Sequence, residues 1–449
     1  MWQMLKNRIR KLKPAQLIVT YYFLAISLSF GLLRLPWVHQ PGQEVSLIDS
    51  LFTAVSAVSV TGLTVIQITD TYTVFGILMV MLILQLGGIG IMSLGTFVWL
   101  LIGKRIGLRE RQLIMLDHNQ YNLSGVVKLI IEIIKILLLI EAIGALLLSL
   151  YFTQFYETWT EAVLQGVFAS VSATTNGGFD ITGQSMIPYA NDYFVQIITI
   201  LLIILGAIGF PVLIELKQFL SHKSGPFRFS LFSKLTTITF GILLVVGTIL
   251  IYLIEYNQRF ADVSWHQGLF YALFQSVSTR SGGLVTIEVS TFTEPTQLIL
   301  SLLMFIGASP SSVGGGIRTT TLAIAVLFLI NFSRGRHHIQ VFGREIHLID
   351  IFRSYVVIIL AVLMSMISVI TIMIIEDLDV ITVLFEVTSA FGTSGMSLGI
   401  TPTLSTPSKV ILMVLMFIGR VGLISFLFMI GGNNKKEKFH YPKERVIIG

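Results

Sequence analysis

The sequence contains no cysteine, and only 12% of its 449 residues are charged. Without cysteine the chain cannot form disulfides, thiolate metal sites or a thiol nucleophile, which excludes several classes of enzyme and of secreted scaffold. So few charged side chains cannot cover the surface of a water-soluble protein of this length. The composition therefore points away from a soluble enzyme.

Apolar residues make up 54% of the chain. Eight apolar runs are long enough to cross the ~30 Å hydrocarbon core of a bilayer as helices. They cover approximately 15 to 35, 72 to 102, 126 to 152, 193 to 216, 235 to 254, 296 to 331, 354 to 375 and 408 to 431. The first run follows a basic stretch, as in a signal sequence, but it is longer than a typical h-region and no small-residue cleavage site follows it. We therefore count it as a spanning helix.

Lysine and arginine collect in five segments between and around the predicted spans. These segments hold 23 of the 30 Lys and Arg residues and cover 1 to 13, 104 to 128, 217 to 234, 334 to 353 and the tail from Lys435. With eight spans all five fall on one side, and basic loops mark the cytoplasmic side. The sequence predicts a multi-pass protein of the plasma (cell) membrane with both termini cytoplasmic. Acids are in excess on the other side, which predicts an external vestibule that concentrates cations.

Four short stretches of the chain resemble one another and recur at offsets of 105 to 116 residues. They read TAVSAVSVTGLT, SVSATTNGGFD, QSVSTRSGGLV and EVTSAFGTSGMS, with matched glycines at Gly62, Gly178, Gly283 and Gly395. Internal repetition of this kind predicts fourfold pseudo-symmetry. Each stretch lies between two spans on the outer side and is about half as long as a spanning helix, which is typical of a re-entrant segment.

Four such loops around one axis favour a pore. Helices that descend from outside aim their partially negative C-terminal ends at the centre, and a glycine turn leaves carbonyl oxygens free to replace the water shell of an ion. The alternative is that small residues only pack between helices, which is common in membranes but does not account for four stretches in register. The predicted ion-binding residues are Val60, Thr61, Gly62, Asn176, Gly177, Gly178, Ser281, Gly282, Gly283, Thr393, Ser394 and Gly395.

The span after each loop also repeats a glycine motif, read as LGGIG, LGAIG, IGASP and IGRVG. The predicted fold is therefore an all-α integral membrane protein with four pseudo-symmetric helix–pore-loop–helix repeats, eight transmembrane helices in total, around a central pore. The repeats cover 15–103, 126–217, 235–332 and 354–431; cytoplasmic loops cover 104–125, 218–234 and 333–353; cytoplasmic ends cover 1–14 and 432–449.

The third repeat contains a further unusual segment, residues 308–321, which reads ASPSSVGGGIRTTT. One helix over 296 to 331 would be ~54 Å long, and proline and consecutive glycines are poor helix formers. The segment predicts an intramembrane loop below the four glycine loops, where it can occlude the pathway. A kink that only aids packing is the alternative.

Two arginines are candidates for a functional role. Arg420 lies within the last span, where a charge is expensive unless it faces water or a partner. The alternative is a simple ion pair with an acid such as Glu215. Arg280 lies three residues before Gly283, where a bare cation would oppose cation binding. We predict that Glu386 of the fourth pore segment neutralises it.

With these motifs the chain resembles the Trk/Ktr/HKT superfamily of potassium transporters, and most closely the KtrB membrane subunits of bacterial Ktr systems. The resemblance covers essentially the whole chain. It implies that the four matched glycines belong to a selectivity filter for K+, the transported ion. Relatives with serine at the first position tend to favour sodium, so Gly62 implies a preference for potassium. The four loops lack the uniform TVGYG sequence of tetrameric channels, so weaker selectivity is expected.

The same resemblance implies a gate and partners. Ser311, Ser312, Val313, Gly314, Gly315 and Gly316 match the family's gating loop, and Arg420 matches its arginine below the filter. The family works as a homodimer on a cytosolic KtrA-like ring of nucleotide-binding regulatory subunits. The basic loops fit either such a ring or membrane lipid, and we expect the tail 436–449 to stabilise the dimer. Na+ is left open as an activator, and no nucleic acid partner is indicated.

Two other functions remain as alternatives. The first is a sodium-coupled or sodium-selective transporter of the same superfamily. The second is a multipass membrane enzyme, which would need intramembrane clusters of His, Asp or Glu. The Gly-rich stretch SVGGGIRT lacks the Lys-Ser/Thr of a phosphate-binding loop, and no cofactor bound by this chain is evident. We therefore predict that the chain is not an enzyme.

Overall fold

The computed structural model describes residues 14–90, 107, 111, 125–222, 225–336, 338–430, 442 and 444. The described chain is helical apart from one two-stranded hairpin, β1 (Gln340–Val341) and β2 (Arg344–Glu345). The predicted all-α membrane fold is confirmed. The predicted ends 1–14 and 432–449 and the loop 104–125 lie almost wholly outside the described residues, as does the tail predicted to stabilise a dimer.

Each of the four repeats supplies a long helix, a short pore helix and a second long segment. The first two repeats contain α2 (Pro14–Leu33), α3 (Leu47–Ser59), α4 (Ile68–Thr71), α5 (Val74–Ile89), α8 (Val126–Phe152), α9 (Trp159–Thr174), α10 (Tyr193–Ala207) and α11 (Phe210–Ser221). The last two contain α12 (Leu231–Glu255), α13 (Trp265–Ser278), α14 (Glu294–Phe305), α15 (Thr319–Ser333), α16 (Leu348–Ile375), α17 (Val380–Gly392), α18 (Thr406–Val421) and α19 (Leu423–Ile430). Short 3-10 turns cover Pro36–Val38, Ile187–Tyr189, Val289–Thr291 and Thr401–Thr403.

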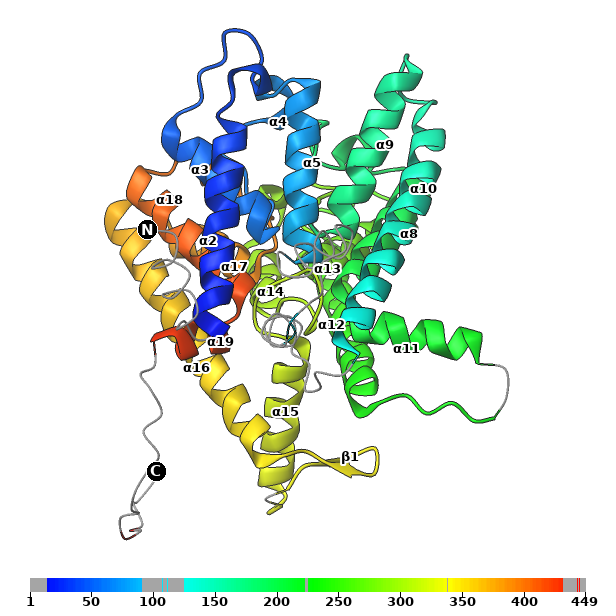
Figure 1. Ribbon diagram of the computed structural model, residues 1–449, viewed down its shortest axis with the longest axis vertical. Coiled ribbons are helices and arrows are strands. Elements are labelled where there is room, and N and C mark those ends of the chain that lie inside the picture. The colour runs from blue at the N-terminus through cyan, green and yellow to red at the C-terminus, as the bar shows by residue number, and fades with distance from the viewer. Residues whose placement is uncertain are drawn as a thin grey trace.

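The repeats close into a ring around the pore helices α3, α9, α13 and α17. The second segment of each repeat packs on the pore helix of the next one: α5 on α9, α10 on α13, α14 on α17, and α18 back on α3. Figure 1 shows α13 and α17 near the middle of the molecule, with the β1 hairpin and α15 at the lower end. This closed order gives the four pore helices one common centre.

The first helix of each repeat is continuous. Among the described residues, α2, α8, α12 and α16 are each long and apolar enough to span. Each has many exposed leucine, isoleucine and phenylalanine side chains, for example Leu139 and Ile374, as expected for lipid-facing surfaces.

The second segment is interrupted in the second, third and fourth repeats, whereas the sequence indicated a break only in the third. In the first repeat the continuous described chain stops at Gly90, directly after α5. In the second repeat Gly209 separates α10 from α11, and in the fourth Gly422 separates α18 from α19. Gly90, Gly209 and Gly422 have nearly the same backbone angles, with φ of 90°, 103° and 89°. Residues with side chains rarely adopt these angles, so the final glycine of each motif ends a helix. Pro310 takes that place in the third repeat.

The pore helices begin at side chains that cap them. Ser46 accepts a hydrogen bond from the backbone of Asp49 at 3.1 Å, and Asp379 accepts one from Thr382 at 2.9 Å. Thr158 caps α9 through Glu161 at 3.3 Å, and Ser264 forms a capping box with Gln267. The caps satisfy amides that a helix leaves unpaired at its start. They fix where each short helix begins and hence where it ends.

Candidate functional site

The four pore helices end in turns with one shared backbone conformation. The matched glycines Gly62, Gly178, Gly283 and Gly395 all have positive φ, between 67° and 91°. The residues two positions earlier are also left-handed although they carry side chains, and these are Val60, Asn176, Ser281 and Thr393, with φ between 47° and 67°. Left-handed β-branched residues are rare and cluster at functional sites. The same unusual turn therefore occurs at four places in one chain.

One serine per pore helix closes each turn. In three repeats its carbonyl accepts the amide of the residue before the matched glycine: Ser56 from Thr61 at 2.8 Å, Ser172 from Gly177 at 2.7 Å and Ser389 from Ser394 at 2.9 Å. In the third repeat Ser278 accepts from both Gly282 and Gly283, at 2.7 and 3.3 Å. That repeat has one residue fewer between its serine and its glycine, so its turn is tighter.

The four glycines meet in a closed ring that follows chain order. A Cβ atom on Gly62 would lie 2.8 Å from Gly178 Cα, and one on Gly178 would lie 3.1 Å from Gly283 Cα. A Cβ atom on Gly283 would lie 3.4 Å from Gly395 Cα, and one on Gly395 would lie 2.9 Å from Gly62 Cα, which closes the ring.

Carbonyl oxygens lie in the same ring. Each of the four hypothetical Cβ atoms would contact the oxygen of the residue before the neighbouring glycine, and these residues are Gly177, Gly282, Ser394 and Thr61. The ring therefore has no room for side chains, and it gathers four equivalent carbonyl groups at one centre. Eight of the twelve residues predicted as ion-binding therefore meet in this ring, namely the four glycines and the residues before them. The other four, Val60, Asn176, Ser281 and Thr393, lie in the same turns.

The loop between α14 and α15 lies directly against the tips of the third and fourth repeats. Gly314 packs on Ser281, since a Cβ there would lie 2.6 Å from Ser281 Cβ. Gly315 packs on Thr393, since a Cβ on Gly315 would lie 2.6 Å from Thr393 Cγ2. Val313 is fully buried and belongs to the same apolar cluster as Val60. The predicted loop residues are therefore buried from Ser311 to Gly315, and Gly316 is partly buried.

Hydrogen bonds attach this loop to the break between α10 and α11. The amides of Ser309 and Val313 donate to Ala207 and Gly206 at 3.1 and 3.2 Å. In return, the Phe210 amide donates to the Ser311 carbonyl at 2.8 Å. The backbone groups left unpaired by the helix break thus form hydrogen bonds with those of the loop. Such partners are needed within a membrane, because lipid offers none to a polar backbone group.

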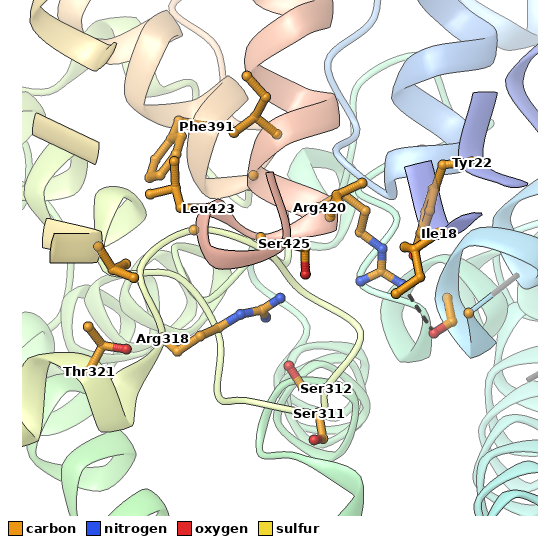
Figure 2. Close-up of a pocket in the computed structure, with 18 of the residues that line it drawn as sticks. Ile18, Tyr22, Ser311, Ser312, Arg318, Thr321, Phe391, Arg420, Leu423 and Ser425 are labelled. Carbon is orange, nitrogen blue, oxygen red and sulfur yellow. Dashed lines mark hydrogen bonds between the residues drawn. The ribbon is translucent and has the colours of Figure 1, made fainter. Parts of the chain in front are cut away.

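Two arginines hold the loop from different sides. Arg420 donates to the Val313 carbonyl and to the Gly87 carbonyl of α5, and its side chain is buried. Arg318 donates to the Gly314 carbonyl. Figure 2 shows both side chains at one cavity of about 110 Å³, together with Ser311 and Ser312. The alternative partner for Arg420, Glu215, instead accepts the amide of Ser230 at 3.0 Å.

The predicted pair of Arg280 and Glu386 is wrong. Arg280 is fully buried and donates to the carbonyl of Leu303, in the last turn of α14. Glu386 accepts the Leu398 amide at 3.1 Å and the Thr401 hydroxyl at 2.9 Å. Arg280 thus bonds to a carbonyl of α14, and Glu386 bonds to the segment that follows α17.

Two of the acids predicted to face outward, Asp49 and Glu376, have structural partners. Asp49 forms an ion pair with Lys409 at 2.9 Å, which joins α3 to α18. Glu376, after α16, accepts both the amide and the hydroxyl of Ser405. The Ser405 hydroxyl holds the pKa of Glu376 below its ordinary value. These contacts account for part of the outer acidic excess.

Lowering the pH below about 4.5 is expected to destabilise the protein partly through Glu376. A depressed folded-state pKa contributes stability above the unfolded value of 4.5, and that stability is lost as the pH falls through the folded value. Thermal unfolding of detergent-solubilised protein measures this loss. Glu376→Gln should show a shallower fall of Tm with pH than the unchanged protein. A fall of equal steepness would contradict the role of Glu376.

Sequence reasoning missed two features of the site. Arg318 was part of the 308–321 segment, but its contact with Gly314 was not anticipated, although an arginine directly after a glycine run was a visible signal. The four closing serines appear in all four aligned stretches. They can be recognised as equivalent because each lies five or six residues before its matched glycine.

Comparisons with known proteins agree with this architecture. Residues 6–435 match the family model of TrkH, described as a cation transport protein. The chain is 55% identical over 441 residues to the Ktr system potassium uptake protein D of Bacillus subtilis, with 98% of each chain covered. It is 32% identical over 438 residues to the Ktr system potassium uptake protein B of the same organism, with 97% of each covered.

A solved structure has the same fold. The potassium transporter TrkH from Vibrio parahaemolyticus superposes with a TM-score of 0.74 at 19% identity, covering 94% of this chain and 86% of that one. The relatives are transport proteins and not enzymes, in agreement with the prediction that this chain is not an enzyme. The chain belongs to the TrkH family of cation transport proteins.

Proposed function

We propose that this protein takes up potassium through the ring of four glycine-tipped loops. The observation that carries the proposal is the closed ring of Gly62, Gly178, Gly283 and Gly395, with a carbonyl from each loop beside the next glycine. Carbonyl oxygens replace the hydration shell of potassium, and four pore helices direct their partially negative ends at the centre. The potassium uptake named for the relatives of high identity supports the same ion.

The loop 308–321 acts as the gate in this proposal. Val313 packs in the same apolar cluster as Val60, and Arg420 and Arg318 donate hydrogen bonds to carbonyls of the loop. A fixed positive charge below the filter also raises the barrier to a cation. Potassium moves inward down its electrochemical gradient when the loop is displaced.

The proposal also covers the membrane location of the protein and its partner subunits. The protein lies in the plasma membrane with both termini cytoplasmic, forms a homodimer and is regulated by a cytosolic nucleotide-binding ring. The membership of its relatives in a named Ktr system supports a multi-component assembly. Na+ as an activator belongs to the same proposal.

Uptake into liposomes tests the function. Purified protein should pass K+ and Rb+ faster than Na+, and a nucleotide-binding regulatory subunit should change the rate. Sodium flux equal to or above potassium flux would favour the sodium-selective alternative. No monovalent cation flux in any condition, from correctly folded protein, would refute the assignment.

A further inference from the structure

Helix α11 turns out of the bundle directly after Gly209. Its axis makes an angle of 106° with α10. The 15 residues of α10 span ~22 Å from the outer side, so α11 begins near the inner edge of the ~30 Å hydrocarbon core. Figure 1 shows α11 projecting sideways beyond α8 and α12. It therefore runs along the membrane plane.

The projecting half of α11 has two different faces. Leu216, Phe219 and Leu220 are exposed by 41%, 46% and 76% and share one face at positions i, i+3 and i+4. Lys217, Gln218 and Ser221 occupy the remaining positions and are also exposed. A helix of this composition suits the boundary between acyl chains and headgroups.

Aromatic and basic groups extend this surface. The ring of Phe219 packs against Phe227 and Phe229, with centroids 5.6 and 5.4 Å apart, and His222 contacts Phe227 at 5.6 Å. Arg228 lies exposed between the two phenylalanines. Aromatic rings anchor at headgroup depth, and basic residues there attract anionic lipid.

The other end of α11 contacts the gate loop. Its first residue, Phe210, donates its amide to the Ser311 carbonyl at 2.8 Å. Farther along the helix, Glu215 accepts the Ser230 amide at 3.0 Å, and Lys217 pairs with Glu132 of α8. These contacts join α11 to the start of α12 and to α8. Phe210 belongs to the same continuous helix as the projecting half, so a displacement of α11 also moves Phe210.

We propose that α11 and residues 225–229 form an in-plane anchor that binds anionic phospholipid headgroups of the cytoplasmic leaflet and thereby holds the gate loop through Phe210. The anchor itself is independent of the transported ion. Its effect on the gate rests on the function proposed above. With the anchor bound, the loop stays in its observed position, so uptake without a regulatory partner is lower in anionic membranes.

Spin labels test the anchor without any transport measurement. Because the chain has no cysteine, Leu220→Cys and Gln218→Cys each give a single labelling site. In vesicles of phosphatidylcholine and phosphatidylglycerol, the label at 220 should be accessible to oxygen, and the label at 218 to a water-soluble relaxation agent. Equal access of both labels to water would overturn the anchor. Protection of 220 from both agents would also overturn it, since a second protein copy then covers this face.

Uptake in two lipids tests the link to the gate. Uptake without partner should be lower in the anionic vesicles than in phosphatidylcholine alone, by up to about fivefold for one basic residue at an anionic surface. Arg228→Gln should remove most of this difference, whereas Arg259→Gln, an exposed arginine on the outer side, should leave it unchanged. Equal uptake in both lipids would overturn the link. Absence of uptake in every lipid would refute the transport function, while the labels still decide the anchor.

Discussion

A serine in place of Gly62 is expected to lower the preference for potassium over sodium about tenfold. Gly62 has a φ of 89°, and its Cβ would lie 2.7 Å from the Gly177 oxygen and 2.8 Å from Gly178 Cα. The left-handed angle alone costs ~1–2 kcal/mol for a residue with a side chain, and ~1.4 kcal/mol corresponds to a factor of ten. The tip relaxes by moving its carbonyl groups, which removes the fit to one ion size. Relative uptake of K+, Rb+ and Na+ into liposomes measures the change.

Gly42→Ser is the matched control. Gly42 has a similar φ of 84° but nothing within 4 Å of its hypothetical Cβ, so serine there introduces the same backbone strain without crowding the ring. Gly42→Ser should keep the selectivity of the unchanged protein. If Gly62→Ser also kept its selectivity while remaining folded and active, the carbonyl-ring explanation would be rejected.

The sequence was sufficient to predict the repeats, because each repeat solves the same physical problem. A half-length helix with a glycine turn needs partners at membrane depth, and four such units can satisfy one another. The sequence was less informative about the breaks in the second segments of the repeats. Gly209 and Gly422 lie inside continuous apolar runs, so hydropathy alone extends the helix through them. Only their alignment with Pro310 signals the breaks.

The sequence was misleading about the partners of Arg280 and Glu386. Arg280 and Glu386 have opposite charges at related positions, which suggested a pair. In the fold the Leu303 carbonyl is the partner of Arg280, and the Leu398 amide is a partner of Glu386. The left-handed angles of Val60 and Thr393 also had no sequence signal, since β-branched residues normally avoid them. Tertiary contacts impose these angles.

Shortening the gate loop across Ser311 to Gly316 is expected to raise uptake about tenfold or more. This segment contains Val313, which shares an apolar cluster with Val60 and whose carbonyl accepts a hydrogen bond from Arg420. Its removal clears the space below the ring and breaks the bond. The measurement is the initial rate of Rb+ uptake into liposomes without a regulatory partner. Lower or equal uptake from a folded variant would contradict a blocking role.

Arg420→Gln tests the same gate without changing the length of the loop. Hydrogen bonds from a charged donor contribute ~1.5–3 kcal/mol each, and Arg420 donates to two carbonyls, those of Val313 and Gly87. Loss of both should favour the displaced loop by about tenfold or more in uptake rate.

Arg420→Lys separates the two effects of Arg420. It keeps the positive charge, but a lysine ammonium lacks the planar fork that reaches both carbonyls. If the hydrogen bonds hold the gate, both variants raise uptake. If the charge alone is the barrier, only Arg420→Gln does. Unchanged uptake in both folded variants would show that the loop is held closed by packing around Val313, and Arg420 would then have no part in gating.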